Sequence, residues 1–327
     1  MTLVPFSCRA SKAVTTRSSG FRLNFCTQSC VLLFRGLTVR KQTVYTWTLL
    51  APWLVTFVIF WLYPLAYALL LSLSDYETLT NRMTFIGLDN YRRAFHDKDF
   101  WNAMTNTVIF TFGTVPITTA LAIALAVAVR QSTPRLASFF RASFFLPSVT
   151  SLVVIALVFT NLYARDGYVN VICAMMGIGY PADGWLLNPG TALPAIMAMD
   201  VWISAGYYMV LFLAGMESIS ADIYESAELV GASRWQQFRR LTLPMLRPTL
   251  LFVVVINSIK SFQIFVEVYI MTKGGPLGAT STLVYEVYHQ AFEQSDSMGY
   301  ASAVAYVIFI ILMAISLIQL RILKGRA

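Results

Sequence analysis

Charged residues are scarce in this sequence. They make up 12% of its 327 residues, whereas hydrophobic residues make up 57%. Soluble domains carry about 25% charged residues, and a chain this apolar has too few polar groups to cover its surface in water. The composition therefore excludes an ordinary soluble domain and indicates an integral membrane protein with lipid as its main surroundings.

Residue patterns typical of enzymes and metal sites are also missing. The four cysteines form no disulfide framework or zinc spacing, and the two histidines, His96 and His289, stand in no ligand pattern. The sequence contains no Gly-x-x-x-x-Gly-Lys-Ser/Thr phosphate loop and no Gly-x-Ser-x-Gly nucleophile elbow. We therefore expect no metal, no cofactor and no catalytic residue, and an enzyme is disfavoured.

Six apolar stretches are long enough to cross a bilayer. A helix needs about 20 apolar residues to cross roughly 30 Å of hydrocarbon. The stretches cover residues 46–71, 103–129, 142–163, 191–216, 249–271 and 300–320. The sequence thus predicts an all-α integral membrane protein with six transmembrane helices.

Lys and Arg are distributed unevenly over the segments that join these stretches. If the N-terminus is cytoplasmic, the inner segments contain the basic clusters at 9–41, 130–141, 234–247 and 321–326. Because cationic loops stay on the cytoplasmic side, we expect both termini to lie inside. This topology accounts for the net charge of +8, so nucleic-acid binding is not needed to explain it.

Polar tails flank the apolar part of the chain. Residues 1–42 are basic, contain no Asp or Glu and have no clear periodicity. We expect a disordered N-terminal tail, and whether it belongs to the mature protein stays open. Residues 322–327 form a short basic C-terminal tail, which leaves 43–321 as the membrane domain.

A charged segment, residues 217–245, separates the fourth and fifth stretches. Each charge at the centre of a membrane helix costs about 2.5–3.5 kcal/mol, so this segment stays in water. Ser220 is placed to cap a helix with Asp222 in its first turn, and Gly231 is placed to end that helix.

A second short helix is expected directly after this turn. Ser233 and Gln236 have the spacing of a capping box, and Pro244 should end the helix. The segment is therefore predicted to be a helical hairpin that projects from the inner face of the membrane.

The same segment carries a recognisable pattern. Glu225 and Ala227 form a Glu-x-Ala unit, Gly231 follows four residues after the Ala, and the segment ends in Leu243-Pro244. This pattern resembles the coupling loop of ABC importer permeases of the carbohydrate and glycerol-phosphate type. Ser226 stands where that family usually has Ala, a conservative change in size.

The resemblance covers residues 43–321 and implies a function. Such a permease translocates a carbohydrate that an external binding protein delivers, in the inner membrane of a bacterium. A dimer of separate ATPase subunits drives it, and a second permease of the same family completes the pore. The positions that match the family's ATPase-coupling residues are Glu225, Ser226, Ala227, Gly231, Ala232, Leu243 and Pro244.

Polar residues inside the fourth and fifth stretches are candidates for a substrate pathway, because polar groups are costly in a membrane. Amides, carboxylates and aromatic rings are also the groups that recognise sugars. The candidates are Asp200, Trp202, Tyr207, Asn257, Lys260, Gln263 and Glu267. The alternative is that these side chains tie helices together or face the partner permease.

The single ammonium of Lys260 could offset the charge of glycerol-3-phosphate. An Arg cluster would hold a dianion better, however, and Asp200 and Glu267 lie in the vicinity. Lys260 and Glu267 themselves stand about 10.5 Å apart along a helix, too far for a direct ion pair. A neutral carbohydrate is therefore favoured over a polyol phosphate.

Two other classes of function remain open at this stage. An ion-coupled secondary transporter would use Asp200 and Glu267 as coupling sites. A membrane scaffold or membrane-bound enzyme would lack ATPase partners altogether. The alternative for residues 217–245 is an amphipathic hairpin that lies on the lipid without a partner.

Overall fold

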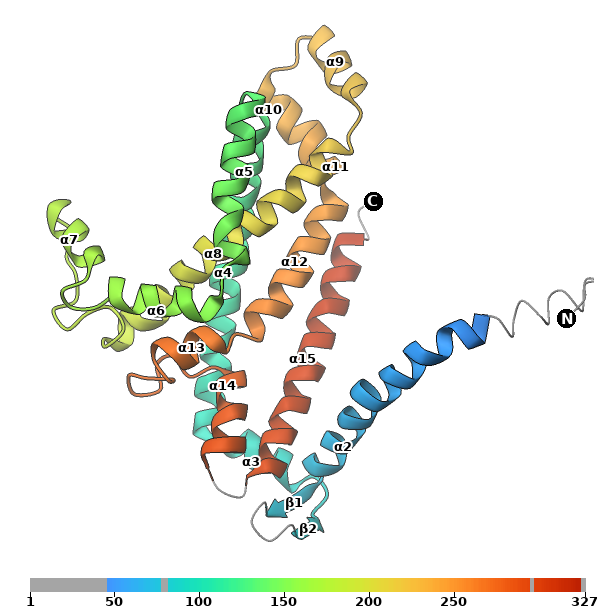
Figure 1. The fold of residues 1–327 in the computed structure, drawn as a ribbon, viewed down its shortest axis with the longest axis vertical. Helices are drawn as coiled ribbons and strands as arrows, with labels where there is room; N and C mark the ends of the chain where they lie inside the picture. Colours follow the sequence, from blue (N-terminus) through green and yellow to red (C-terminus); the bar gives the residue numbers. More distant parts are fainter. Residues whose placement is uncertain (1–45, 78–81, 295–296, 325–327) are drawn as a thin grey trace, which may run out of the picture. The chain divides into compact units, whose positions relative to one another are not determined.

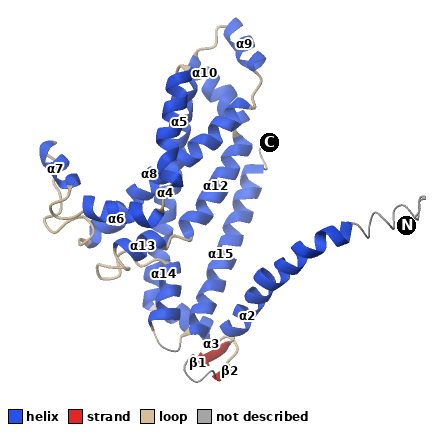
Figure 2. Ribbon diagram, viewed as in Figure 1, coloured by secondary structure: helices blue, strands red, loops and turns tan. Residues whose placement is uncertain are grey.

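The computed structural model describes residues 46–77, 82–294 and 297–324, without the side chains of the last two residues. The expected N-terminal tail, 1–42, lies outside the described residues, as does the end of the C-terminal tail. The chain divides into two compact units, Met1–Ala66 and Tyr67–Ala327. The described elements are predominantly helical, with one short hairpin of strands (Figure 2).

The first membrane span runs over Thr46–Ser72. It contains one π-helical turn, η1 (Val58–Leu62), and ends as α2 (Tyr63–Ser72). Its side chains are almost entirely apolar, as expected of a helix that faces lipid or a partner. This confirms the span predicted at 46–71.

A small polar cap follows at the end of the first span. Strands β1 (Ser74–Glu77) and β2 (Arg82–Phe85) pair antiparallel, and α3 (Asp89–His96) follows them. The buried Asn90 donates hydrogen bonds to the backbone carbonyls of Ser72 and Ser74, at 3.1 and 2.9 Å. These bonds satisfy carbonyl groups where the helix has ended.

Four long helices form the centre of the second unit. They are α4 (Lys98–Arg130), α8 (Pro189–Glu217), α12 (Arg247–Phe262) and α15 (Met298–Lys324). Helix α4 packs against α8 and α12, and α12 runs alongside α15 (Figure 1). Each forms all or most of a membrane span, which confirms the predictions at 103–129, 191–216, 249–271 and 300–320.

The predicted third span is not one continuous helix. Helix α5 (Pro134–Val149) and helix α6 (Leu152–Leu162) meet at an angle of 95°. Pro147 lacks the amide that would continue the ladder, and Thr150 and Ser151 have extended backbone angles. The apolar run at 142–163 continues through the bend, so hydropathy alone could not locate it.

Shorter helices complete the described part of the chain. They are α7 (Tyr168–Met175), α9 (Ala221–Leu229), α10 (Arg234–Gln237), α11 (Leu243–Met245), α13 (Val266–Met271) and α14 (Leu283–Tyr288). Two π-helical turns, η2 (Phe238–Thr242) and η3 (His289–Glu293), extend α10 and α14. Helix α13 belongs to the fifth span, which includes a short break after α12.

Gly206 sets the distance between α8 and α5. A Cβ atom at this position would clash with the backbone carbonyl of Phe144, so the two helices touch backbone to backbone. Close approach of this kind is how small residues stabilise helix pairs in membranes. The bent α5–α6 segment is thereby fixed against the helix that carries Asp200.

Replacing Gly206 by Ala is expected to destabilise the purified chain by at least about 1–3 kcal/mol, the usual cost of overpacking. The clash is with backbone, so a rotamer change cannot relieve it. Gly190→Ala is the matched control, because it lies in the same helix and its Cβ would meet only the Asn188 side chain at 3.4 Å. Thermal unfolding in detergent checks this, and equal midpoints for the two variants would contradict it.

Candidate coupling loop and intramembrane polar site

The charged segment at 217–245 folds as the expected pair of short helices. Helix α9 ends at a turn in which Gly231 has φ +77°, a left-handed conformation that favours glycine. The backbone N–H of Gln236 donates to the Ser233 hydroxyl oxygen at 3.3 Å, and the backbone N–H of Ser233 donates to Oε1 of the Gln236 side chain at 2.9 Å. The predicted capping box is therefore present.

Two local predictions for this segment are wrong. The Ser220 side chain makes no capping hydrogen bond to α9, although Ser220 is the residue before its first turn. Pro244 does not end the second helix, because the chain remains helical from α10 through η2 into α11. Pro244 instead lies in α11 directly after the π-helical turn η2, and the chain keeps helical angles through it.

The turn between the helices exposes apolar side chains. Leu229 is 89% exposed and Val230 84% exposed, and Trp235 on α10 is also exposed. Helix α9 projects beyond the ends of α5 and α12 (Figure 1). Of the matched coupling positions, Glu225, Ser226 and Gly231 are exposed, whereas Ala227, Ala232, Leu243 and Pro244 are half-buried.

An ion pair stabilises the adjacent helix ends. Arg141 on α5 donates to Glu217 at the last residue of α8, with 2.8 Å between Nη2 and Oε1. Both side chains are exposed, so the pair contributes only about 0–1 kcal/mol. It joins the same two helices that meet at Gly206.

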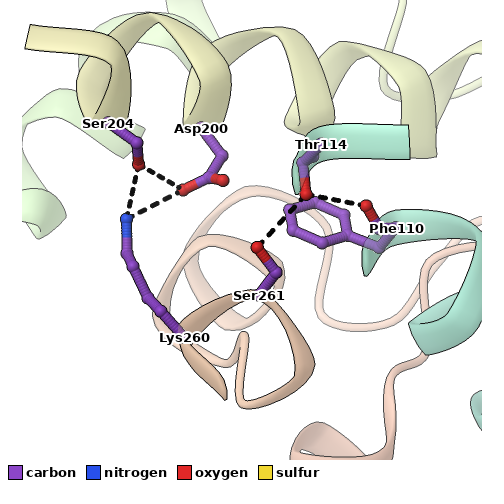
Figure 3. A network of polar contacts seen from close by, with 6 residues as sticks. All are labelled: Phe110, Thr114, Asp200, Ser204, Lys260 and Ser261. Atoms are coloured by element: carbon purple, nitrogen blue, oxygen red, sulfur yellow. Dashed lines mark hydrogen bonds and ion pairs between the residues drawn. The ribbon is translucent and has the colours of Figure 1, made fainter. Parts of the chain in front are cut away.

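A polar cluster lies between α8 and α12 (Figure 3). The ammonium of Lys260 donates to Asp200 Oδ1 at 3.1 Å and to Ser204 Oγ at 2.7 Å. Ser204 lies one turn after Asp200 and donates to the same carboxylate oxygen at 3.2 Å. The two candidate residues Asp200 and Lys260 are thus in direct contact, a pairing that the sequence analysis did not predict.

The two charges of this pair differ in their surroundings. Asp200 is 2% exposed, whereas 43% of the Lys260 side chain is exposed. The Asp200 Oδ2 atom is buried without a hydrogen-bond partner. The carboxylate therefore depends on Lys260 for its charge compensation, while Lys260 presents part of its stem and head at the surface.

The candidate residue Asn257 is fully buried on α12, one turn before Lys260. Neither its Nδ2 nor its Oδ1 has a hydrogen-bond partner. Buried amides are rarely left unpaired, because the desolvation cost is not recovered. On the neighbouring helix α4, Thr114 Oγ1 lies 3.2 Å from Ser261 Oγ (Figure 3). Helix α12 therefore carries the polar side chains of Asn257, Lys260 and Ser261 within little more than one turn.

The remaining four candidates do not join the cluster. Glu267 is buried on α13 and forms no ion pair with Lys260, as expected from their separation. Trp202 and Tyr207 are exposed on α8, where Trp202 lies against Phe159 with 5.4 Å between ring centroids. Gln263 is exposed just after α12.

Sequence reasoning missed a buried carboxylate near the opposite end of the unit from α9. Glu286 on α14 is buried and accepts a hydrogen bond from Gln290 at 2.8 Å. Burial raises the pKa of the Glu286 carboxyl. The Gln290 hydrogen bond and His289 oppose this shift, whereas Asp99 and Asp97 add to it. Glu286 lies between the fifth and sixth predicted stretches, where no sequence pattern signals its burial.

Replacing Glu286 by Gln is expected to stabilise the purified chain at neutral pH. The pKa of the Glu286 carboxyl is higher in the folded state than in the unfolded state. The free energy of unfolding therefore falls as the pH rises from the unfolded-state pKa to the folded-state pKa, because ionisation favours the unfolded chain. Gln cannot ionise and can still accept the Gln290 hydrogen bond, so E286Q should remove this loss. Unfolding midpoints measured from pH 4 to pH 8 check the prediction. An identical pH profile for wild type and E286Q would contradict it, and E228Q on the exposed face of α9 serves as the control.

The Asp200–Lys260 pair predicts an asymmetric cost of substitution. K260M leaves a buried carboxylate without its partner, which costs about 3–5 kcal/mol in comparable pairs. D200N leaves an ammonium that is only half-buried and keeps the Ser204 hydroxyl as an acceptor at 2.7 Å, so it should cost less. The double variant should recover most of the stability lost in K260M. A double-mutant cycle on unfolding midpoints measures this, and additive effects would show that the pair is not coupled.

Comparisons with known proteins were made on the same chain. Residues 118–326 match the family described as binding-protein-dependent transport system inner membrane component. The lactose transport system permease protein LacF of Rhizobium radiobacter is 36% identical, over 87% of this chain and 96% of the relative. The trehalose/maltose permease protein MalF of Thermococcus litoralis is 28% identical, over 85% of this chain and 93% of the relative.

The fold is also found in a solved structure. A bacterial ABC transporter involved in the import of the acidic polysaccharide alginate contains a chain that matches with a TM-score of 0.74. The match covers 89% of this chain and 99% of that chain, at 21% identity. The fold of the chain is therefore similar to that of a chain in a solved transporter structure.

Proposed function

Because the chain belongs to the family of binding-protein-dependent transport system inner membrane components, we propose that it is the permease subunit of an ABC importer for a neutral carbohydrate. Its helices make it a multi-pass inner-membrane protein. The observation that supports the role in coupling is helix α9, which projects from the spans with an exposed acidic face and an exposed apolar tip.

The proposed partners follow from this arrangement. The exposed tip, with Leu229 and Val230, would dock into a groove on one subunit of an ATPase dimer, and Glu225 and Gly231 would lie in that contact. A second permease would complete the pathway, and an external binding protein would deliver the solute. ATP binding and hydrolysis would take place on the partner subunits, and both termini of the permease would be cytoplasmic.

Alternating access would depend on the attachment of α9 to the membrane spans. Closure of the ATPase dimer would displace α9, and the displacement would tilt the spans that α9 adjoins. The pathway would then open outward to receive solute from the binding protein. The exposed candidates Trp202, Tyr207 and Gln263 would face this pathway or the partner permease.

The charge of the polar cluster bears on the kind of solute that the protein would transport. Lys260 is paired with Asp200 at 3.1 Å, so the cluster offers no net positive charge to a phosphate. The names of the relatives LacF and MalF refer to lactose, trehalose and maltose, which are neutral sugars. These observations favour a neutral carbohydrate over glycerol-3-phosphate, and they give no support to an ion-coupled transporter.

Substitution of Gly231 tests the coupling role. G231V should abolish ATP-dependent uptake in proteoliposomes that contain the assembled importer, because a side chain at this turn would obstruct the docked subunit. G231N should also lose uptake, although Asn tolerates a left-handed backbone. A Cβ at Gly231 meets nothing within 4 Å in the isolated chain, so membrane insertion should be unaffected.

Gly177 provides the matched control for this experiment. It has φ +69° and equally open surroundings, but it lies in the loop after α7. G177V should carry the same backbone strain, about 1–2 kcal/mol, and retain uptake. Full uptake by G231V, or equal losses in G231V and G177V, would count against the proposed docking.

A further inference from the structure

The side-chain hydrogen bonds that join α9 to other described elements centre on one residue. In the part of the chain that the structure describes, the side chains of α9 make hydrogen bonds to other elements only through Tyr224. Ser226 bonds back to its own helix at the Asp222 carbonyl. The carboxylates of Glu225 and Glu228 form no ion pair with the spans. Tyr224 is therefore the polar connection between this helix and the membrane domain.

Tyr224 lies between two elements that are distant in sequence. Arg130, the last residue of α4, donates from Nη1 to the Tyr224 hydroxyl at 3.0 Å, and its guanidinium carbon lies 4.6 Å from the ring centroid. The hydroxyl also lies 3.0 Å from Thr242 Oγ1 on η2. The Tyr224 side chain thus combines two hydrogen bonds with a cation–π contact.

The donors and acceptors of these groups form one consistent chain. Thr242 Oγ1 donates to the Gln237 carbonyl at 3.5 Å, so its oxygen accepts from the Tyr224 hydroxyl. That hydroxyl in turn accepts from Arg130, which can only donate. In a series of hydrogen bonds such as this one, each bond polarises the next group and strengthens its bond. Phenylalanine at position 224 would remove both hydrogen bonds and keep the ring.

A cavity surrounds this connection. It measures about 330 Å³ and is lined by side chains of α9, α10, η2 and the ends of α4 and α8, among them Val127, Gln131, Met216 and Phe238. Where a cavity is present, no packed side chains can carry a displacement across it. Across this cavity, movement of α9 can therefore reach the spans through the Tyr224 contacts, in addition to the backbone at the two ends of the helix.

Arg130 and Thr242, the two hydrogen-bond partners of Tyr224, are linked along their helices to polar groups inside the membrane. Arg130 ends α4, the helix that carries Thr114, and Thr242 leads through α11 into α12, the helix that carries Lys260. Thr114 and Ser261 join these two helices at 3.2 Å. A displacement of Tyr224 would therefore act on both helices at once.

We propose that Tyr224 is a positioning residue that transmits the movement of α9 to α4 and α12. This inference rests on the proposed function, because it assumes that ATPase subunits move α9. It assigns to Tyr224, Arg130 and Thr242 a role in coupling that is separate from docking. Loss of the Tyr224 hydroxyl should leave the partner bound and its hydrolysis intact, while less of the movement reaches the spans.

The experiment measures solute transported per ATP hydrolysed in proteoliposomes that contain the complete importer, with lactose and maltose as the solutes tested. Y224F should retain the ATPase subunits on copurification and retain hydrolysis. Its ratio of transport to hydrolysis should fall about tenfold, the scale of a lost hydrogen bond to a charged group. T242V should show the same uncoupling, and T242S, which keeps the hydroxyl, should restore the ratio.

The matched control is Y180F, which removes a phenolic hydroxyl from a loop tyrosine and should leave the ratio unchanged. A wild-type ratio in Y224F would overturn the inference, as would loss of the ATPase subunits from Y224F, which would make Tyr224 a docking residue. A T242S variant that stays uncoupled would also overturn it. Failure of the wild-type importer to hydrolyse ATP during uptake would instead reject the proposed function.

Discussion

A buried carboxylate constrains the centre of this membrane domain. Asp200 lies in an otherwise apolar helix, is 2% exposed and has one oxygen atom without a partner. Such a group is tolerated in a membrane only with a compensating charge. Lys260 supplies that charge from α12, so α8 and α12 must stay within reach of each other. Gly206 allows α5 to approach α8 from another side, and the three helices are thereby held around one ion pair.

Much of this architecture follows from sequence patterns with a clear physical origin. Five long apolar runs became spans because the bilayer leaves a helix as the only local way to satisfy the backbone. The capping box at Ser233 and the turn at Gly231 depend on neighbouring residues alone, so both could be predicted. The family of the chain was indicated by the same local pattern around Glu225 and Gly231.

The features that sequence reasoning missed depend on tertiary contacts. The bend between α5 and α6 lies inside one apolar run, where hydropathy does not change. The pairing of Asp200 with Lys260 joins residues 60 positions apart, and the contact of Tyr224 with Arg130 joins residues 94 apart. The bend, the ion pair and the tyrosine contact concern how elements meet, which a single sequence does not encode locally. Pro244 was a local error, because the helix that it was expected to end continues from η2 into α11.

The packing around the polar cluster differs from the packing at the base of α9. The polar cluster lies among closely packed helices, where Phe110, Ile196 and Met199 are fully buried. The base of α9 instead borders a cavity of about 330 Å³, and among the described residues Tyr224 alone gives α9 side-chain hydrogen bonds to other elements. A helix packed on all sides would resist displacement, and a helix without a connection would move without effect. In the proposed mechanism, an open space crossed by a hydrogen-bonded tyrosine would permit movement and still transmit it, because Arg130 ends α4 and Thr242 leads into α12, the helices that join at Thr114 and Ser261. Of these two helices, α12 also carries Lys260, so the proposed movement would reach the ion pair with Asp200 on α8.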